Sequence, residues 1–167
     1  LVAASGLAGF VDAIAGGGGL VLLPALLIGL PSDVPIPTLL GTNKLAAISG
    51  TTAAAWHYGR ESLLDLRTAA GPVLAAMAGS AVGARLAYGL DPTVLRPVML
   101  ALLAGMLAFT LARPDVGRKS EPRFGDGTRT AVASGLALAI GFYDGFFGPG
   151  TGSLLLFLYA GVLGLDF

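Results

Sequence analysis

Long apolar stretches alternate with short polar interruptions along this chain, and the apolar stretches have the length of membrane spans. Uncharged runs cover residues 13–32, 45–59, 68–84, 97–112, 130–143 and 145–165. A helix needs about 20 mostly apolar residues to cross the hydrocarbon core of a bilayer. The pattern therefore predicts three ordinary transmembrane helices, over residues 42–58, 66–88 and 93–111.

The polar interruptions carry the expected start and stop signals. Pro31, Pro35 and Pro37 are expected to break the chain before the first predicted span. Asp91 is predicted to cap the third span, with Pro92 as its first helical residue, because proline is well tolerated there.

Two further apolar segments, residues 1–30 and 131–165, are interrupted by glycine near their middle. A continuous helix over 131–165 would be roughly 50 Å long at 1.5 Å per residue, longer than a bilayer core is thick. Each segment is therefore expected to be either a broken helix or a helical hairpin. The interruptions are Gly16, Gly17, Gly18 and Gly19 in the first segment, and Gly145, Gly148, Pro149, Gly150 and Gly152 in the second.

These two segments resemble each other and indicate an internal repeat. The sequence ASGLA occurs at residues 4–8 and again at 133–137, and GFVD at 9–12 is matched by GFYD at 141–144. Matched interruptions in two halves of a membrane protein are typical of a transporter binding site.

The expected organisation follows from this repeat. A first transmembrane repeat covers 1–111, a hydrophilic linker 112–130, and the start of a second repeat 131–167. The chain, which begins with Leu1, is expected to be a fragment of a longer protein.

The composition also indicates a membrane protein and excludes several other classes of protein. The chain is 54% hydrophobic and 12% charged, whereas soluble domains carry about 25% charged residues. An ordinary soluble globule and a disordered chain are both excluded. The absence of cysteine excludes a disulfide scaffold and cysteine-ligated metal or redox sites, and we expect no metal and no other cofactor. The predicted fold class is all-α, a polytopic transmembrane bundle with an internal repeat and two glycine-broken helices, in contact with the lipid bilayer.

The positions of the charged residues predict how the chain is oriented in the membrane. The net charge is zero, which gives no electrostatic footprint for nucleic acid. Eight of the twenty charged residues lie in 112–130, and the loop 59–67 carries Arg60 and Arg67. Lys and Arg in short loops favour the cytoplasmic side, so both loops are predicted to be cytoplasmic in a multi-pass protein of the inner (plasma) membrane. The side of the N-terminus stays open.

The glycine clusters are the first candidates for substrate binding. Glycine permits irregular backbone and close approach to a ligand, and the helices that follow each cluster would point their N-termini, which favour anions, at the break. The alternative is that the glycines only allow tight helix packing. A dinucleotide-type phosphate loop is rejected because no βαβ unit surrounds the glycines. The candidates are Gly16, Gly17, Gly18, Gly19, Gly148, Gly150, Thr151 and Gly152.

Asp12 and Asp144 occupy matching positions of the repeat inside apolar runs. An ionisable residue inside the membrane is by default a hypothesis of function, and a carboxyl there is a candidate for proton coupling. The alternative is that each aspartate caps the backbone at its helix break.

Lys44 is the only basic residue between Leu1 and Tyr58. With Thr42 and Asn43 it is expected to open the span 42–58 and to bind an anion, with hydrogen bonds donated by the two polar neighbours. The alternative is that the Lys44 side chain reaches from a helix end to the membrane interface.

Other polar residues carry weaker signals. Ser49, Thr51 and Thr52 line the same pathway or bond their own backbone, and His57 belongs to an interfacial belt rather than to a catalytic site. Glycines at 71, 79 and 83 share a helix face, and the last two form a G-x-x-x-G packing signal.

Three motifs together resemble the TauE/SafE sulfite exporter family of membrane transporters, in its YfcA-like branch. They are residues 10–20 (FVDAIAGGGGL) with Pro24, residues 41–45 (GTNKL), and residues 141–152 (GFYDGFFGPGTG). The resemblance implies about eight helices in two related halves. It also implies transport of small anions such as sulfite, sulfonates or related organic anions, coupled to an ion gradient.

The sequence thus predicts a small-anion transporter and not an enzyme. A non-transporting membrane scaffold or assembly protein is the main alternative, and an intramembrane enzyme has no visible nucleophile–base pair. The expected partners are a small anionic substrate and the lipid bilayer, with no nucleic acid; a homo-oligomer is left open.

Overall fold

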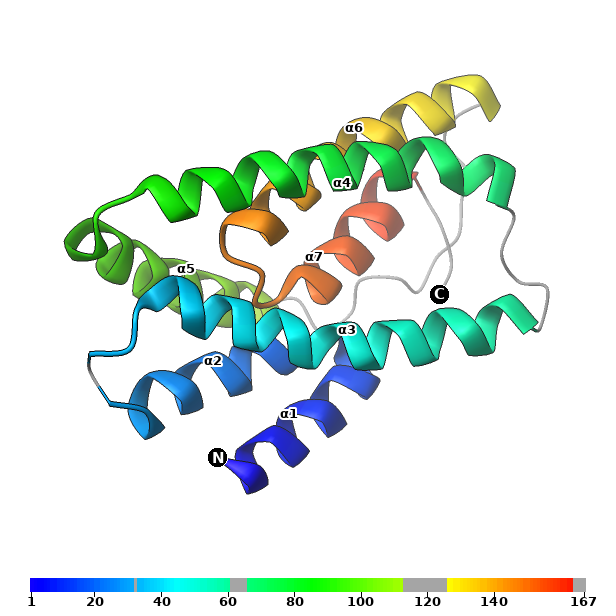
Figure 1. Ribbon diagram of the computed structural model, residues 1–167. Coiled ribbons are helices and arrows are strands. Elements are labelled where there is room, and N and C mark those ends of the chain that lie inside the picture. The colour runs from blue at the N-terminus through cyan, green and yellow to red at the C-terminus, as the bar shows by residue number, and fades with distance from the viewer. Residues whose placement is uncertain (32, 61–65, 113–125, 164–167) are drawn as a thin grey trace.

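A computed structural model describes residues 1–31, 33–60, 66–112 and 126–163 of the chain (Figure 1). Every regular element in these ranges is helical, which confirms the predicted all-α class. The elements are α1 (Val2–Ala15), α2 (Gly18–Gly29), α3 (Ile36–Arg60), α4 (Leu66–Gly89), α5 (Pro92–Ala112), α6 (Asp126–Phe146), α7 (Thr151–Leu158) and a π-helical extension η1 (Tyr159–Leu163).

The first glycine-broken segment is a helical hairpin. Gly16 ends α1 in the left-handed conformation, with φ of 65°, which glycine adopts without steric cost. The chain then folds back, so that a Cβ built on Gly29 at the end of α2 would lie 2.9 Å from the Leu1 side chain. Of the two forms left open by the sequence, the hairpin is therefore the one observed.

The second broken segment repeats this arrangement. Gly148 and Gly150 turn the chain with φ of 94° and 81°. The Tyr159 hydroxyl then donates a 3.0 Å hydrogen bond to the Ala133 carbonyl, which shows that the chain after the turn runs back along α6.

Two of the three predicted spans correspond to helices with nearly the predicted bounds. Thr68–Gly89 and Pro92–Phe109 are long and apolar enough to cross a membrane, in place of the predicted 66–88 and 93–111. The α5 start signal is also as predicted: α5 begins at Pro92, and the Asp91 carboxylate accepts hydrogen bonds from the Thr93 N–H at 2.8 Å and the Thr93 hydroxyl at 2.6 Å.

The start of the remaining span was predicted wrongly. Helix α3 begins at Ile36, not at residue 42. Pro37 does not break the helix because it lies in the first turn, where its missing N–H has no partner to lose. Lys44 therefore lies about two turns inside α3 rather than at a helix end, which removes the basis for expecting it to reach the interface.

Helices α4 and α6 pack through their glycines, as the G-x-x-x-G signal predicted. A Cβ on Gly79 or Gly83 would collide with the backbone of α6, and one on Gly141 or Gly145 with the backbone of α4. Gly71 faces α6 as well, since its Cβ would lie 3.2 Å from the Ser134 hydroxyl. Small residues on both sides let the two backbones approach closely.

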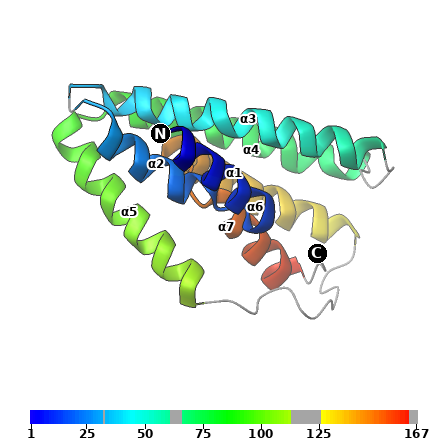
Figure 2. The same ribbon diagram turned by 90° about the horizontal axis from the view of Figure 1, so that it is seen from below.

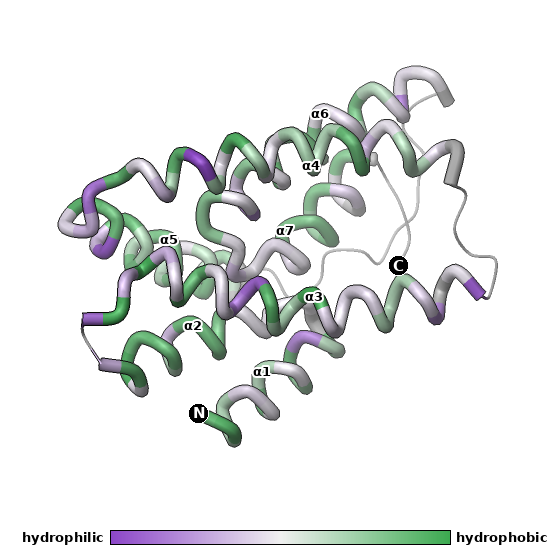
Figure 3. The backbone as a smooth tube through the Cα atoms, viewed as in Figure 1, coloured by the Kyte–Doolittle hydropathy of each residue, from purple (hydrophilic) through white to green (hydrophobic). Residues whose placement is uncertain are grey.

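The buried core gathers between α2, α3 and α5. Leu23, Leu95, Met99 and Phe147 are 1% exposed or less. Large apolar side chains also cover the outside of the bundle, with Phe10 at 65% exposed, and Figure 3 shows hydrophobic colour along the outer helices. Such a surface suits lipid rather than water.

The two hairpins lie at opposite ends of the bundle. Helix α2 leads into α3 at one end, α3, α4 and α5 run back and forth along the bundle, and α6 starts from the other end (Figures 1 and 2). The hairpin tips, at the two glycine turns, meet in the middle.

Candidate functional site

The tips of the two hairpins contact each other through backbone atoms. A Cβ built on Gly16 would lie 3.0 Å from the Gly152 Cα, and one on Gly152 would lie 2.5 Å from the Gly16 carbonyl oxygen. Beside them, a Cβ on Gly17 would lie 3.7 Å from the Ser153 hydroxyl. The structure thus joins two clusters that lie more than 130 residues apart in the sequence, and only glycine fits at the closest point.

Helix α3 closes one side of this contact. A Cβ on Gly19 would lie 3.0 Å from the Pro149 Cα and 3.2 Å from the Asn43 amide nitrogen. Asn43 is only 6% exposed, and its amide nitrogen lies beside the point where Gly19 faces Pro149. This is the one side chain of the predicted polar triplet that is buried.

Lys44 lies over the tip of the second hairpin. Its ammonium group donates a 2.9 Å hydrogen bond to Asp144 Oδ2 and forms an ion pair with it, with the two side chains 32% and 37% exposed. A Cβ on Gly148 would lie 3.2 Å from the Lys44 Nζ. The second carboxylate oxygen, Asp144 Oδ1, accepts a 3.0 Å hydrogen bond from the Thr151 hydroxyl.

Asp12 has a different partner. Its Oδ1 accepts a 2.9 Å hydrogen bond from the Gly18 N–H at the start of α2. The carboxylate therefore satisfies one of the donors that the first turn of a helix leaves unpaired and places a negative charge at the positive end of the helix. This is the hydrogen bond expected if Asp12 caps its helix break.

Three hydroxyls of α3 bond within their own helix. Thr42, Ser49 and Thr51 each donate to a backbone carbonyl three or four residues earlier in α3, and all three are exposed. Ser49 and Thr51 therefore make the backbone hydrogen bonds of their second predicted alternative, and Thr42, which was predicted to donate to the anion, donates to the Thr38 carbonyl instead. His57 is exposed as well, and the described residues contain no cluster of three His, Cys, Asp or Glu that would hold a metal ion.

The ion pair is the feature that the sequence predictions missed. Lys44 and Asp144 were each singled out, but not as partners, because 100 residues separate them. The available signal was that isolated opposite charges in apolar segments usually pair with one another. A second missed contact is the 2.8 Å hydrogen bond from the Tyr143 hydroxyl to the Pro149 carbonyl, which fixes the second tip.

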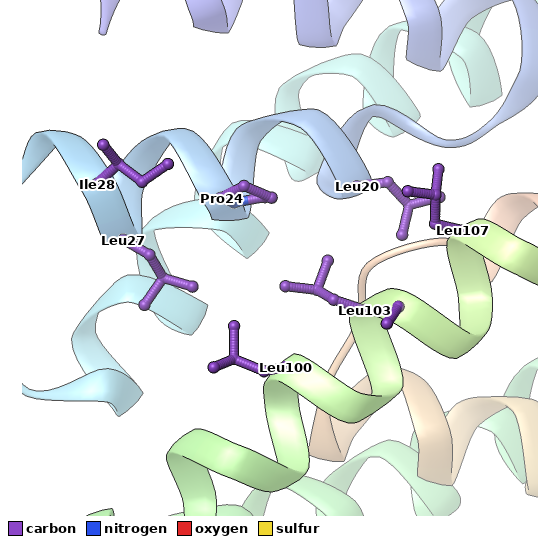
Figure 4. A pocket seen from close by; sticks show the side chains of 8 residues that line it. Leu20, Pro24, Leu27, Ile28, Leu100, Leu103 and Leu107 are labelled. Atoms are coloured by element: carbon purple, nitrogen blue, oxygen red, sulfur yellow. The ribbon is translucent and has the colours of Figure 1, made fainter.

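An apolar cavity of about 300 Å³ lies apart from this polar cluster, between α2 and α5. Figure 4 shows Pro24 and Leu27 on one wall and Leu100 and Leu103 on the other. Such a lining offers an anion no hydrogen bond, so the tips and not this cavity form the candidate anion site.

Comparison with known proteins gives one family. The family model for the sulfite exporter TauE/SafE matches residues 1–167. A "Probable membrane transporter protein" of Haemophilus influenzae is 34% identical over 161 residues, 95% of this chain and 60% of that protein. "Probable membrane transporter protein ORF9" of a Sinorhizobium species is 38% identical over 157 residues, 93% of this chain and 58% of that protein.

"Probable membrane transporter protein YfcA" of Escherichia coli K12 is 34% identical over 160 residues, 96% of this chain and 58% of that protein. The chain thus spans about 60% of the length of these curated relatives. No solved structure matches it.

Proposed function

The chain belongs to the TauE/SafE sulfite exporter family, and from this premise we propose that the full-length protein carries small anions across the membrane. Sulfite, sulfonates and related organic anions are the proposed substrates, and an ion gradient drives their movement. The family and the matched relatives are named as exporters and transporters, not as enzymes.

One observation carries this proposal: two glycine tips and a cationic side chain converge at one place. The N-terminal ends of α2 and α7 lie at the tips, and helix N-termini favour anions. Asp12 already occupies one donor of α2, whereas the N-cap of α7 is Gly150, which has no side chain to cap the first turn. Lys44 supplies a full positive charge within the same cluster, and the Asn43 amide supplies a hydrogen-bond donor. The proposed substrate-binding residues are Gly16, Gly17, Gly18, Gly19, Thr42, Asn43, Lys44, Gly148, Gly150, Thr151 and Gly152.

The topology supports alternating access to that site. Three helices, α3, α4 and α5, separate the two hairpins, so the hairpins enter the bilayer from opposite faces if each of the three crosses it. With the basic loops 59–67 and 112–130 on the cytoplasmic side, the α1–α2 hairpin enters from outside. The tips then meet near the bilayer midplane, where inverted repeats place their substrate sites.

The main alternative remains a non-transporting membrane scaffold. The packing of α4 on α6 through Gly79 and Gly83 is compatible with such a protein. The tips are built differently, since Gly148 and Gly150 have positive φ, a conformation that serves a turn rather than helix packing.

Flux of labelled sulfite into proteoliposomes that contain the full-length protein tests the proposal. Vesicles with the wild type should accumulate more sulfite than protein-free vesicles. The flux should be at least about tenfold lower with Lys44→Gln, which corresponds to about 1.4 kcal/mol of lost anion stabilisation. Arg85→Gln is the matched control, because it removes an exposed cation of α4 outside the site. Equal flux in the Lys44→Gln and Arg85→Gln proteins would contradict the proposed site, and no flux in the wild type would favour a scaffold.

A further inference from the structure

The two repeat-matched aspartates are chemically unequal in the folded protein. Asp12 is engaged by the backbone N–H of Gly18, and the contact is so close that a Cβ on Gly18 would lie 2.6 Å from the Asp12 Cβ. Asp144 is engaged by side chains, the Lys44 ammonium and the Thr151 hydroxyl. The N–H of Gly18 is part of the backbone at the start of α2, so it moves only with that backbone, whereas the ammonium of a lysine moves on a flexible four-carbon stem.

The ion pair also poses a problem of charge for anion binding. With Lys44 bonded to Asp144 at 2.9 Å, the pair has no net charge, and an incoming anion meets a carboxylate beside the ammonium. The anion and the Asp144 carboxylate require the same cation. An anion therefore binds well only when the negative charge of Asp144 is removed, and a proton removes it without any displacement of the backbone.

We propose that the Lys44–Asp144 pair couples anion binding to proton binding, whereas Asp12 is a fixed cap. This rests on the proposed anion transport. A proton from water binds the Asp144 carboxylate, Lys44 keeps its own proton and its charge, and the freed ammonium binds one monovalent oxyanion, such as a sulfonate. The site is neutral before binding and neutral again when it holds both ions, so proton and anion move together without net charge.

The surroundings of the pair favour this exchange. Both side chains are about one third exposed, so the described part of the chain does not enclose the pair. Asp144 faces Lys44 from α3 and Thr151 from α7. A second acidic residue near the tips is Asp12, which lies in the first hairpin, and the tip of that hairpin contacts the second one. Helix α4, which packs along α6, carries Arg85, whose side chain is exposed. Among the described side chains, no second cation is therefore paired with Asp144 to hold its charge when Lys44 leaves.

Binding of methanesulfonate to the purified full-length protein tests this coupling, because a sulfonate stays ionised at all working pH values. In the wild type, the dissociation constant should rise about tenfold for each pH unit once Asp144 is ionised, since one proton accompanies one anion. Asp144→Asn carries a neutral amide in place of the carboxylate, so its dissociation constant should be nearly independent of pH. Asp12→Asn should keep the wild-type slope.

Each outcome distinguishes the two proposals. An Asp144→Asn protein with the wild-type pH slope, or an Asp12→Asn protein that loses the slope, overturns the coupling while leaving transport intact. A wild type that neither binds nor transports an anion at any pH overturns the proposed function itself. If Asp144→Asn does not fold, proton uptake by the wild type in weakly buffered solution decides: about one proton per methanesulfonate supports the coupling, and none overturns it.

Discussion

Replacement of Gly152 by alanine tests whether the hairpin tips touch as closely as the structure shows. The new Cβ would lie 2.5 Å from the Gly16 carbonyl oxygen and 2.8 Å from the Gly16 Cα. Ordinary contacts begin at 3.4 Å, so one tip must retreat by about 0.9 Å. Both neighbours are backbone atoms, and no side-chain rotation relieves the overlap.

The cost can be separated from the helical preference of alanine. Inserting a methyl group into a packed interior costs about 1–3 kcal/mol, whereas Gly→Ala within a helix gains up to about 1 kcal/mol. Gly135→Ala in α6 is the matched control, because a Cβ there meets nothing within 4 Å. The difference between the two variants isolates the overlap and should be about 1–3 kcal/mol.

Unfolding of the full-length variants in mixed detergent micelles, followed by circular dichroism, measures this difference. Sulfite flux should fall in Gly152→Ala and persist in Gly135→Ala, since a shift of about 0.9 Å displaces the groups of the proposed anion site. Equal stability and equal flux in the two variants would refute the tip contact.

Three further substitutions probe other parts of the fold. Gly83→Ala should lower the free energy of unfolding by about 1–3 kcal/mol because its Cβ collides with the α6 backbone, and a wild-type midpoint of unfolding would contradict that packing. The hydrogen bonds from Thr93 hold the pKa of Asp91 below its ordinary value, so the contribution of this cap to stability is complete above the ordinary pKa and is lost as the pH falls through the lowered one. The difference in melting temperature between the wild type and Asp91→Ala should therefore shrink in acid, and a difference that grows in acid would contradict the cap. Tyr143→Phe should cost about 1–3 kcal/mol by leaving the Pro149 carbonyl without its donor, measured by the same unfolding assay.

The parts of the fold that depend on local signals were predictable. Helix length and apolar composition defined α4 and α5, and the Asp91–Pro92 pair defined the start of α5. The glycines at 79 and 83 predicted a packing face, because small residues at that spacing leave a groove for another helix.

The parts of the fold that depend on contacts between residues far apart in the sequence were not predictable. Glycine clusters permit both a kinked helix and a hairpin, and only the packing of α2 along α1 and of α7 along α6 selects the hairpin. The start of α3 was missed because proline is tolerated in a first turn. The Lys44–Asp144 pair required knowledge that α3 crosses the tip of the second hairpin, which no local pattern contains.

A disulfide between the two tips tests the central claim most directly. The chain has no cysteine, and a Cβ on Gly17 would lie 3.7 Å from the Ser153 hydroxyl, within the reach of a disulfide. In the full-length protein, with any other cysteine removed, Gly17→Cys combined with Ser153→Cys should cross-link on oxidation. Sulfite flux should then stop and return on reduction, whereas each single variant should be insensitive to the oxidant. Failure to cross-link, or full flux through the cross-linked protein, would contradict an anion site between moving hairpin tips.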